Sequence, residues 1–149
     1  MADDAYVPSP WDWVSNQVEV YERSGGTEAN TLLDTGMPII ILTTTGRKTG
    51  AERKSPLMRV EHEGTHALVA SMGGAPKQPV WYLNLVAHPD RVVLQDGPVP
   101  RRVDVREIHG DEKAEWWERC VAAYPPYAEY QTRTTREIPV VLATPAPNG

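Results

Sequence analysis

Tight turns between runs of β-branched and apolar residues constrain this chain more than any other feature of its sequence. The run MPIIILTTT at 37–45 is followed at once by GRKTG at 46–50, and a second extended run begins at residue 53. Connections of the same short kind occur at 63–64 and at 97–98. A pair of parallel strands needs a crossover of a dozen or more residues, so these connections require antiparallel neighbours.

Other segments repeat apolar residues at helical spacing, and their ends carry helix signals. Ser9 and Pro10 suit the start of the first helix, Gly25 and Gly26 its end, and Asp111 is expected to cap the last helix. About six antiparallel strands with flanking helices predict an α+β fold, either a barrel or a sandwich with helices packed outside. Predicted strands occupy 37–45, 53–64, 66–72, 91–97, 99–108 and 138–144, and predicted helices occupy 9–24, 79–88 and 110–124, with a linker or short helix at 125–137.

The length predicts one domain over 1–149, beginning with a flexible lead and an N-terminal helix at 1–26. The single cysteine, Cys120, excludes an internal disulfide, and MADDAYVPSP lacks the basic and apolar regions of a secretory signal. We therefore expect a cytoplasmic protein. Cys120 falls in the apolar stripe of a predicted helix, which predicts an inert core thiol. No run of 18 apolar residues predicts a membrane span.

The turn at 46–50 concentrates positive charge in an acidic chain. Residues 47–54 hold four cations and one acid, whereas the whole chain has a net charge of −5. Glycines let the backbone approach a ligand, arginine grips phosphate with two donors, and lysine and threonine add a charge and a hydroxyl. A hairpin tip whose charges deter strand pairing is the alternative. The candidate anion site consists of Arg47, Lys48, Thr49, Gly50 and Arg53.

Two further segments are candidates for a binding pocket. After the third predicted strand, two glycines lead to a helix N-terminus, where free amides can meet an anion or a ring edge beside Ser71 and Lys77. Tyr124, Tyr127 and Tyr130 recur every three residues, so one helical turn places three phenols on one face. Phenols there can bind a flat substrate and donate protons. The alternatives are a plain connection and an amphipathic lid over the core.

Several classes of function lack their signatures. The four histidines have no metal-ligand spacing, no G-x-S-x-G accompanies a Ser-His-Asp set, and no G-x-G-x-x-G follows a strand. GRKTG is not a Walker phosphate loop, because it lacks the four-residue gap before Gly-Lys and no helix follows it. The acidic net charge argues against general nucleic-acid binding.

Three segments together resemble a known family: TTTGRKTGAERKSPL, ALVASMGGAPKQPVWYLNLVAHP and YPPYAEYQTRTTREIPVV, in unbroken order. They are similar to the deazaflavin-dependent nitroreductase family of actinobacteria, whose members use reduced coenzyme F-420 (8-hydroxy-5-deazaflavin) and include quinone reductases. The resemblance implies a flavin-binding split β-barrel like that of pyridoxamine-phosphate oxidases, with the cofactor site in a core at 37–143. It also implies hydride transfer to a quinone, a nitroaromatic or a similar electron-poor acceptor.

The resemblance assigns roles to residues of this chain. The basic turn would hold the phosphodiester and oligoglutamate tail of the coenzyme, the segment around 71–82 would flank its ring, and the phenols would close the acceptor pocket. No metal is implied. The implied catalytic residues are Tyr130, Tyr127, Tyr124 and Ser71. The implied coenzyme-binding residues are Arg47, Lys48, Thr49, Gly50, Arg53, Ser55, Pro56, Met58, Ser71, Met72, Gly73, Ala75, Lys77, Val80, Trp81 and Tyr82.

The chain departs from the family's nitroreductases at two positions, with Met58 in place of a tyrosine and Met72 in place of a lysine. The first change alters the pocket and the second removes a coenzyme contact, so nitroimidazole turnover is not implied. Two alternatives stay open: an FMN-binding oxidoreductase on the same barrel, and a non-catalytic F-420 carrier or small-molecule-binding protein.

For partners, we expect a small-molecule acceptor, no nucleic acid, and a monomer or homodimer. Peripheral contact with the inner face of the cell membrane, through Trp11 and Trp13, is left open, although the helix that carries them is acidic.

Overall fold

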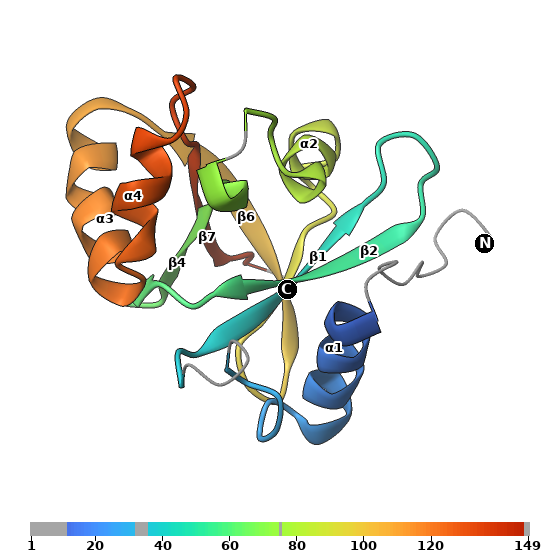
Figure 1. The fold of residues 1–149 in the computed structure, drawn as a ribbon. Coiled ribbons are helices and arrows are strands. Elements are labelled where there is room, and N and C mark those ends of the chain that lie inside the picture. Colours follow the sequence, from blue (N-terminus) through green and yellow to red (C-terminus); the bar gives the residue numbers. More distant parts are fainter. Residues whose placement is uncertain (1–11, 32–35, 75, 148–149) are drawn as a thin grey trace.

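The computed structural model describes residues 12–31, 36–74 and 76–147, which form a curled antiparallel sheet with helices around it (Figure 1). In chain order the elements are α1 (Asp12–Ser24), β1 (Ile39–Thr45), β2 (Glu52–Met58), β3 (Glu61–His62), β4 (Thr65–Val69), the 3₁₀ turn η2 (Met72–Gly74), α2 (Val80–Ala87), β5 (Val93–Gln95), β6 (Pro100–Ile108), α3 (Gly110–Ala123), α4 (Pro126–Thr132) and β7 (Val140–Pro145).

The described strands form one seven-stranded sheet in the order β2-β1-β5-β6-β7-β4-β3. Every neighbouring pair is antiparallel, and the predicted turns at 46–50, 63–64 and 97–98 each join two paired strands. The α+β fold class that the short connections predict is therefore confirmed.

Strand β1 is buried along its whole length because helices cover both of its faces. Ile40 and Leu42 join the core cluster beneath α2, whereas Ile39 and Ile41 pack against Val18 of α1. Figure 1 shows α2 on one side of the β1–β2 hairpin and α1 on the other. A strand covered on both faces has a continuous apolar run instead of an alternating one, which accounts for the sequence IIIL.

A charged cluster joins parts of the sheet that are far apart in strand order. Asp96, just after strand β5, accepts a hydrogen bond from Arg59 Nε at 2.7 Å and lies 2.9 Å from His66 Nε2. Arg59 follows the edge strand β2, and His66 belongs to β4 near the other edge. The hydrogen bond with His66 is the main cause of a lowered pKa of the Asp96 carboxyl, and Arg59 adds to it. The cluster therefore links three segments of the curled sheet that are not neighbours in strand order.

Helices α3 and α4 lie together beside β4 and β7 (Figure 1). Trp116 and Cys120 are the buried residues of α3, and burial raises the pKa of the Cys120 thiol to about 12. A thiol with so high a pKa stays protonated and unreactive, as expected of a core residue.

Some local predictions were wrong. The predicted strand at 53–64 is two strands, because the chain leaves the ladder after Met58 and starts the β3–β4 hairpin at Glu61. The predicted strand at 66–72 ends at Val69, where the chain enters η2. His109, not Asp111, is the N-cap of α3, because the extended backbone of β6 continues to His109, and no side chain caps the helix by hydrogen bonding.

The start of the first predicted helix, at Ser9 and Pro10, lies outside the described residues, as does Trp11. Among the helices that the structure describes, none has the length and apolar character needed to cross a bilayer.

Candidate active site

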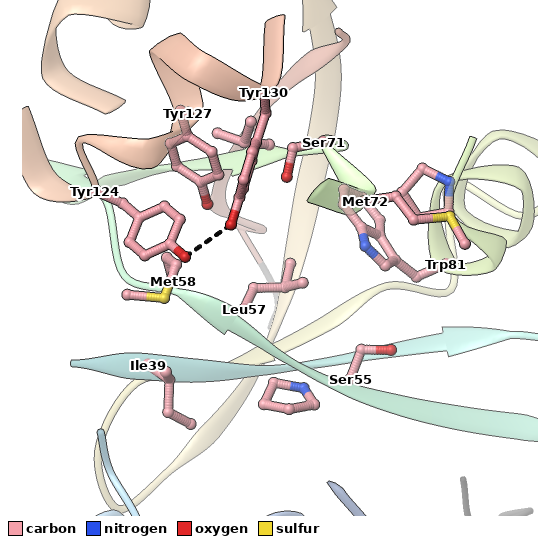
Figure 2. A pocket seen from close by; sticks show the side chains of 13 residues that line it. Ile39, Ser55, Leu57, Met58, Ser71, Met72, Trp81, Tyr124, Tyr127 and Tyr130 are labelled. Carbon is pink, nitrogen blue, oxygen red and sulfur yellow. Dashed lines mark hydrogen bonds between the residues drawn. The ribbon is translucent and has the colours of Figure 1, made fainter. Parts of the chain in front are cut away.

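A pocket of about 290 Å³ opens between β2, the connection from β4 to α2, and α4 (Figure 2). Its walls are largely apolar, with the hydroxyl groups of serine and tyrosine at a few places. That is the composition of small-molecule sites. The lining residues are Ile39, Ser55, Pro56, Leu57, Met58, Val69, Ser71, Met72, Pro79, Trp81, Tyr124, Tyr127 and Tyr130.

Three tyrosines form one wall of the pocket, which we call the phenol wall (Tyr124, Tyr127 and Tyr130). Tyr124 ends α3, and the turn at the start of α4 brings the other two beside it, with ring centroids 4.9 to 6.3 Å apart. The hydroxyls of Tyr124 and Tyr130 are 3.0 Å apart and share a hydrogen bond. The phenols lie together as predicted, but across the junction of α3 and α4 and not on the single helical turn that the spacing predicted, because a new helix begins after Pro125.

Burial controls the acidity of two of these phenols. It raises the pKa of Tyr124 to about 12, with the hydrogen bond to Tyr130 adding to the effect. Burial also raises the pKa of Tyr127, whose residue is only 4% exposed. Both phenols are therefore protonated at neutral pH, so they can donate hydrogen bonds but cannot act as anions.

The opposite wall is formed by the end of β4, η2 and the first turn of α2. Ser71 is buried, and Figure 2 shows its hydroxyl directed into the pocket. Met72 has a left-handed backbone, with φ of 48°, and a side chain at the pocket mouth. Trp81 is buried and contacts Tyr82 edge to face. A strand end, a strained turn and a helix start thus meet at one wall.

The basic turn is the tip of the β1–β2 hairpin, and it is fixed to α2. The Arg47 backbone N–H donates to Asn84 Oδ1 at 3.1 Å. Within the tip, Gly46 N–H donates to Ala51 O and Gly50 N–H to Gly46 O, at 2.7 and 2.8 Å. Gly50 has φ of 73°, a conformation that glycine adopts without strain. The hairpin tip is therefore held beside the helix whose Trp81 lines the pocket.

The cations of the hairpin point to different sides of β2. Arg53 alternates with Ser55 and Leu57, so its side chain shares the face of β2 from which Leu57 packs against the core beneath α2 and lines the pocket. Lys54 has the opposite face, where its ammonium group pairs with the Glu22 carboxylate of α1 at 2.6 Å. Arg47 is exposed at the tip, as is Lys48. The four cations thus have three different positions. Arg47 and Lys48 are exposed at the tip, Arg53 lies on one face of β2, and Lys54 forms an ion pair on the other.

Some of the predicted site residues lie outside the pocket lining. Tyr82 is directed to Glu107 of β6, to which its hydroxyl donates a short hydrogen bond. Thr49 Oγ1 accepts the Ala51 N–H and so shapes the tip. Ala75 lies outside the described residues. Several other predicted residues are not among those that line the cavity: Arg47, Lys48, Thr49, Gly50, Arg53, Gly73 of η2, and the exposed Lys77 and Val80.

The structure adds residues that the sequence did not single out. Ile39, Leu57, Val69 and Pro79 complete the pocket walls, and only their neighbours in the motifs pointed to them. Asn84 supports the hairpin tip, and a lone amide within the apolar helix VWYLNLVA was a signal for it. The described residues contain no group of histidines, cysteines and acids that could hold a metal ion.

Comparisons with known proteins agree on one family. A sequence profile described as F420H(2)-dependent quinone reductase matches residues 13–145. An F420H(2)-dependent quinone reductase of Mycobacterium tuberculosis (strain ATCC 25618 / H37Rv) is 37% identical over 110 residues, which are 72% of this chain and 73% of the relative.

Two solved structures share the fold and much of the sequence. One, described as an F420-H2 dependent reductase (FDR-A), has 52% sequence identity and a TM-score of 0.66, and the match covers 71% of this chain and 93% of that protein. Another, described as a domain-swapped dimer, has 49% identity and a TM-score of 0.69, with coverage of 91% and 99%. These likenesses place the curled sheet among split β-barrels of F-420-dependent reductases.

Proposed function

The chain belongs to the F420H(2)-dependent quinone reductase family and is an F-420-dependent reductase, and we propose that it transfers a hydride from the reduced coenzyme to a quinone or a similar electron-poor ring. The observation that carries the proposal is the position of the pocket between a phenol wall and a basic hairpin. A coenzyme with a flat ring and an anionic tail needs these two surfaces next to each other.

The residues present fit the coenzyme. The pocket offers an apolar slot for a ring, and Arg53 on the pocket face of β2 leads from it toward Arg47 and Lys48 at the hairpin tip. Within the described residues, no acidic partner occupies the side chains of these three cations, so they are available for a phosphodiester or a glutamate tail. A charge-assisted pair of arginine with phosphate is stronger than a neutral hydrogen bond.

When bound, reduced coenzyme F-420 supplies the hydride, from carbon 5 of its deazaflavin ring. The protein's task is then to hold two flat rings face to face and to exclude water. Trp81, Ser71 and Pro79 form the wall against which the coenzyme ring would lie. The phenol wall bounds the remaining space, in which the acceptor ring would stack.

The phenol wall can also supply a proton. Reduction of a quinone to a quinol adds two electrons and two protons, so a hydride leaves one proton to be provided. Tyr130 and Tyr124 share a hydrogen bond at the edge of the pocket, and Tyr124 stays protonated because its pKa is about 12. We assign the proton to Tyr130, with Tyr124 holding its hydroxyl in place.

Anaerobic mixing of the protein with the reduced coenzyme and a panel of quinones and nitroaromatics tests the proposal. Oxidation of the coenzyme, followed by its absorbance, is expected with quinones. A protein that binds the coenzyme but oxidises none of it with any acceptor would be a carrier. A protein that purifies with a bound flavin would point to the FMN alternative.

The assembly is proposed to be a homodimer. The structural neighbour described as a domain-swapped dimer, which covers 91% of this chain, supports it. Light scattering after size-exclusion chromatography measures the mass, and a mass near 16.6 kDa at all concentrations would contradict a dimer.

A further inference from the structure

Arg136 connects the two walls of the pocket, although it lines neither. Its Nη1 donates to Ala70 O at 3.1 Å and to Gln78 Oε1 at 2.9 Å, and its Nη2 donates to Ser71 O at 2.7 Å. These acceptors lie at both ends of the segment that carries Ser71, Met72 and Gly74. One guanidinium group therefore hydrogen-bonds to both ends of the wall against which the coenzyme ring would lie.

The gripped segment has a backbone that needs support. Met72 has φ of 48° and Gly74 has φ of 81°, and Gly74 N–H donates to Ser71 O at 2.9 Å. Ser71 O thus accepts from the turn itself and from Arg136. A residue other than glycine keeps a left-handed conformation only where its surroundings hold it there. Arg136 is the part of those surroundings that hydrogen-bonds to the backbone on this side of the turn.

The other end of the connection is α4, which carries the phenol wall. Gln131 of α4 donates from Nε2 to Arg136 O at 2.9 Å and accepts the Ile138 N–H at 3.0 Å, so it fixes the loop that carries Arg136. A Cβ on Gly74 would lie 2.6 Å from Tyr130 O, so η2 packs directly on α4. The two walls are held together both by the arginine and by close packing.

We propose that Arg136 is a positioning residue that fixes the Ser71–Gly74 segment against Tyr130 and so sets the separation of the two rings in the pocket. The expected effect of Arg136 on turnover rests on the proposed function. Its effect on the Ser71–Gly74 segment does not, because that effect is measured on the coenzyme-free protein. A guanidinium group is required because three acceptors in different directions need a planar, multivalent donor.

Two variants and a control test the proposal. Arg136→Gln removes the grip, Arg136→Lys keeps the charge without the planar donors, and Arg106→Gln removes a bidentate surface pair with Glu112 that is unrelated to the pocket. Hydrogen exchange of the coenzyme-free proteins is measured for the peptide 70–78. We expect faster exchange there in Arg136→Gln, partial restoration in Arg136→Lys, and wild-type exchange in Arg106→Gln.

Kinetics give the second readout. A displacement of about 1 Å in a reacting pair costs on the order of 100-fold, so kcat of Arg136→Gln should fall by roughly 10- to 100-fold. The coenzyme Kd should rise by no more than about tenfold, since the hairpin cations are intact. A role limited to stability would lower Tm without this division between kcat and Kd.

A double variant separates support of the turn from general packing. In a Met72→Gly background the left-handed turn is relaxed, so Arg136→Gln should lower Tm by less than it does in the wild type. Unchanged exchange at 70–78 in Arg136→Gln would overturn the proposal, and so would equal Tm losses in the two backgrounds. If Arg136→Gln does not fold, Arg136→Lys is judged by the same criteria. If the wild type oxidises no reduced coenzyme, the proposed function fails, while hydrogen exchange still decides the role of Arg136.

Discussion

The β1–β2 hairpin and the phenol wall both contribute to the pocket lining, but the hairpin tip and the phenol wall are built by different forces. Arg47 and Lys48 are exposed on a turn that backbone hydrogen bonds hold in place, whereas Tyr127 is 4% exposed and packs in a core cluster. Exposed charges attract over a distance and are screened by salt, but buried rings act only at contact and support the fold. From this difference we propose that the hairpin supplies coenzyme affinity, while the phenol wall supplies chemistry and stability.

The largest effect is expected where the phenol wall is also core. Tyr127→Ala should lower the free energy of unfolding by about 3–5 kcal/mol, as large-to-small aromatic changes do in a core. Tyr127→Phe keeps the ring contacts and should cost far less, and Arg47→Ala, on the exposed tip, should stay within about 0.5 kcal/mol of the wild type. Denaturant unfolding measures all three. Equal losses of unfolding free energy for Tyr127→Ala and Arg47→Ala would contradict the distinction between a buried phenol wall and an exposed hairpin tip.

The second effect concerns the hairpin, where adjacent cations provide a matched pair. Arg53→Gln should weaken coenzyme binding by about 10- to 150-fold, because a charge-assisted hydrogen bond contributes roughly 1.5–3 kcal/mol. Lys54→Gln should leave affinity nearly unchanged, because Lys54 pairs with Glu22 on the opposite face of β2. Fluorescence titration with coenzyme F-420 gives both dissociation constants. If the two variants bind the coenzyme equally weakly, the total charge of the hairpin sets the affinity, and the face of β2 on which each cation lies does not matter.

Local patterns predicted much of this site, and contacts between distant segments account for what they missed. The spacing of Tyr124 and Tyr130 and the turn at 46–50 are visible in the sequence, because each lies within one short stretch of the chain. The ion pair that occupies Lys54 depends on α1, whose Glu22 is 32 positions away from Lys54.

In the fold, too, local patterns predicted some features and contacts between distant segments determine the others. Short connections predicted the antiparallel sheet, but the break of 53–64 into two strands depends on how the sheet curls. Arg136 reaches Ser71 O across 65 positions of the chain, and nothing in TRTTREI indicates that contact. Tyr82 lies in the predicted motif, yet it turns to Glu107 of β6, a partner 25 positions away.

A third, smaller effect tests the chemical role of the phenol wall. Tyr130→Phe should lower kcat by about tenfold, or roughly 1.4 kcal/mol in activation free energy, with little change in coenzyme affinity. The loss is below that of a full general acid because Tyr124, 3.0 Å away, and water can replace the donor. Steady-state kinetics with one quinone, beside Tyr124→Phe, measures it. A raised coenzyme Kd with normal kcat would instead place Tyr130 among the affinity residues.

The smallest effect is expected where the two regions meet, at the mouth of the pocket. Met72 is 54% exposed, and Met72→Lys would add a cation to the wall that Arg136 holds. An exposed charge pair contributes about 0.2–1 kcal/mol, so coenzyme affinity should rise by no more than about fivefold. Because the added charge is exposed, the gain should vanish at about 1 M salt, where the screening length falls to about 3 Å. Titration at low and high salt separates this from a contact effect, since a gain that survives high salt would mean that the lysine touches the coenzyme directly. In that case residue 72 would be part of the wall that contacts the coenzyme, even though the Met72 side chain is exposed in the structure.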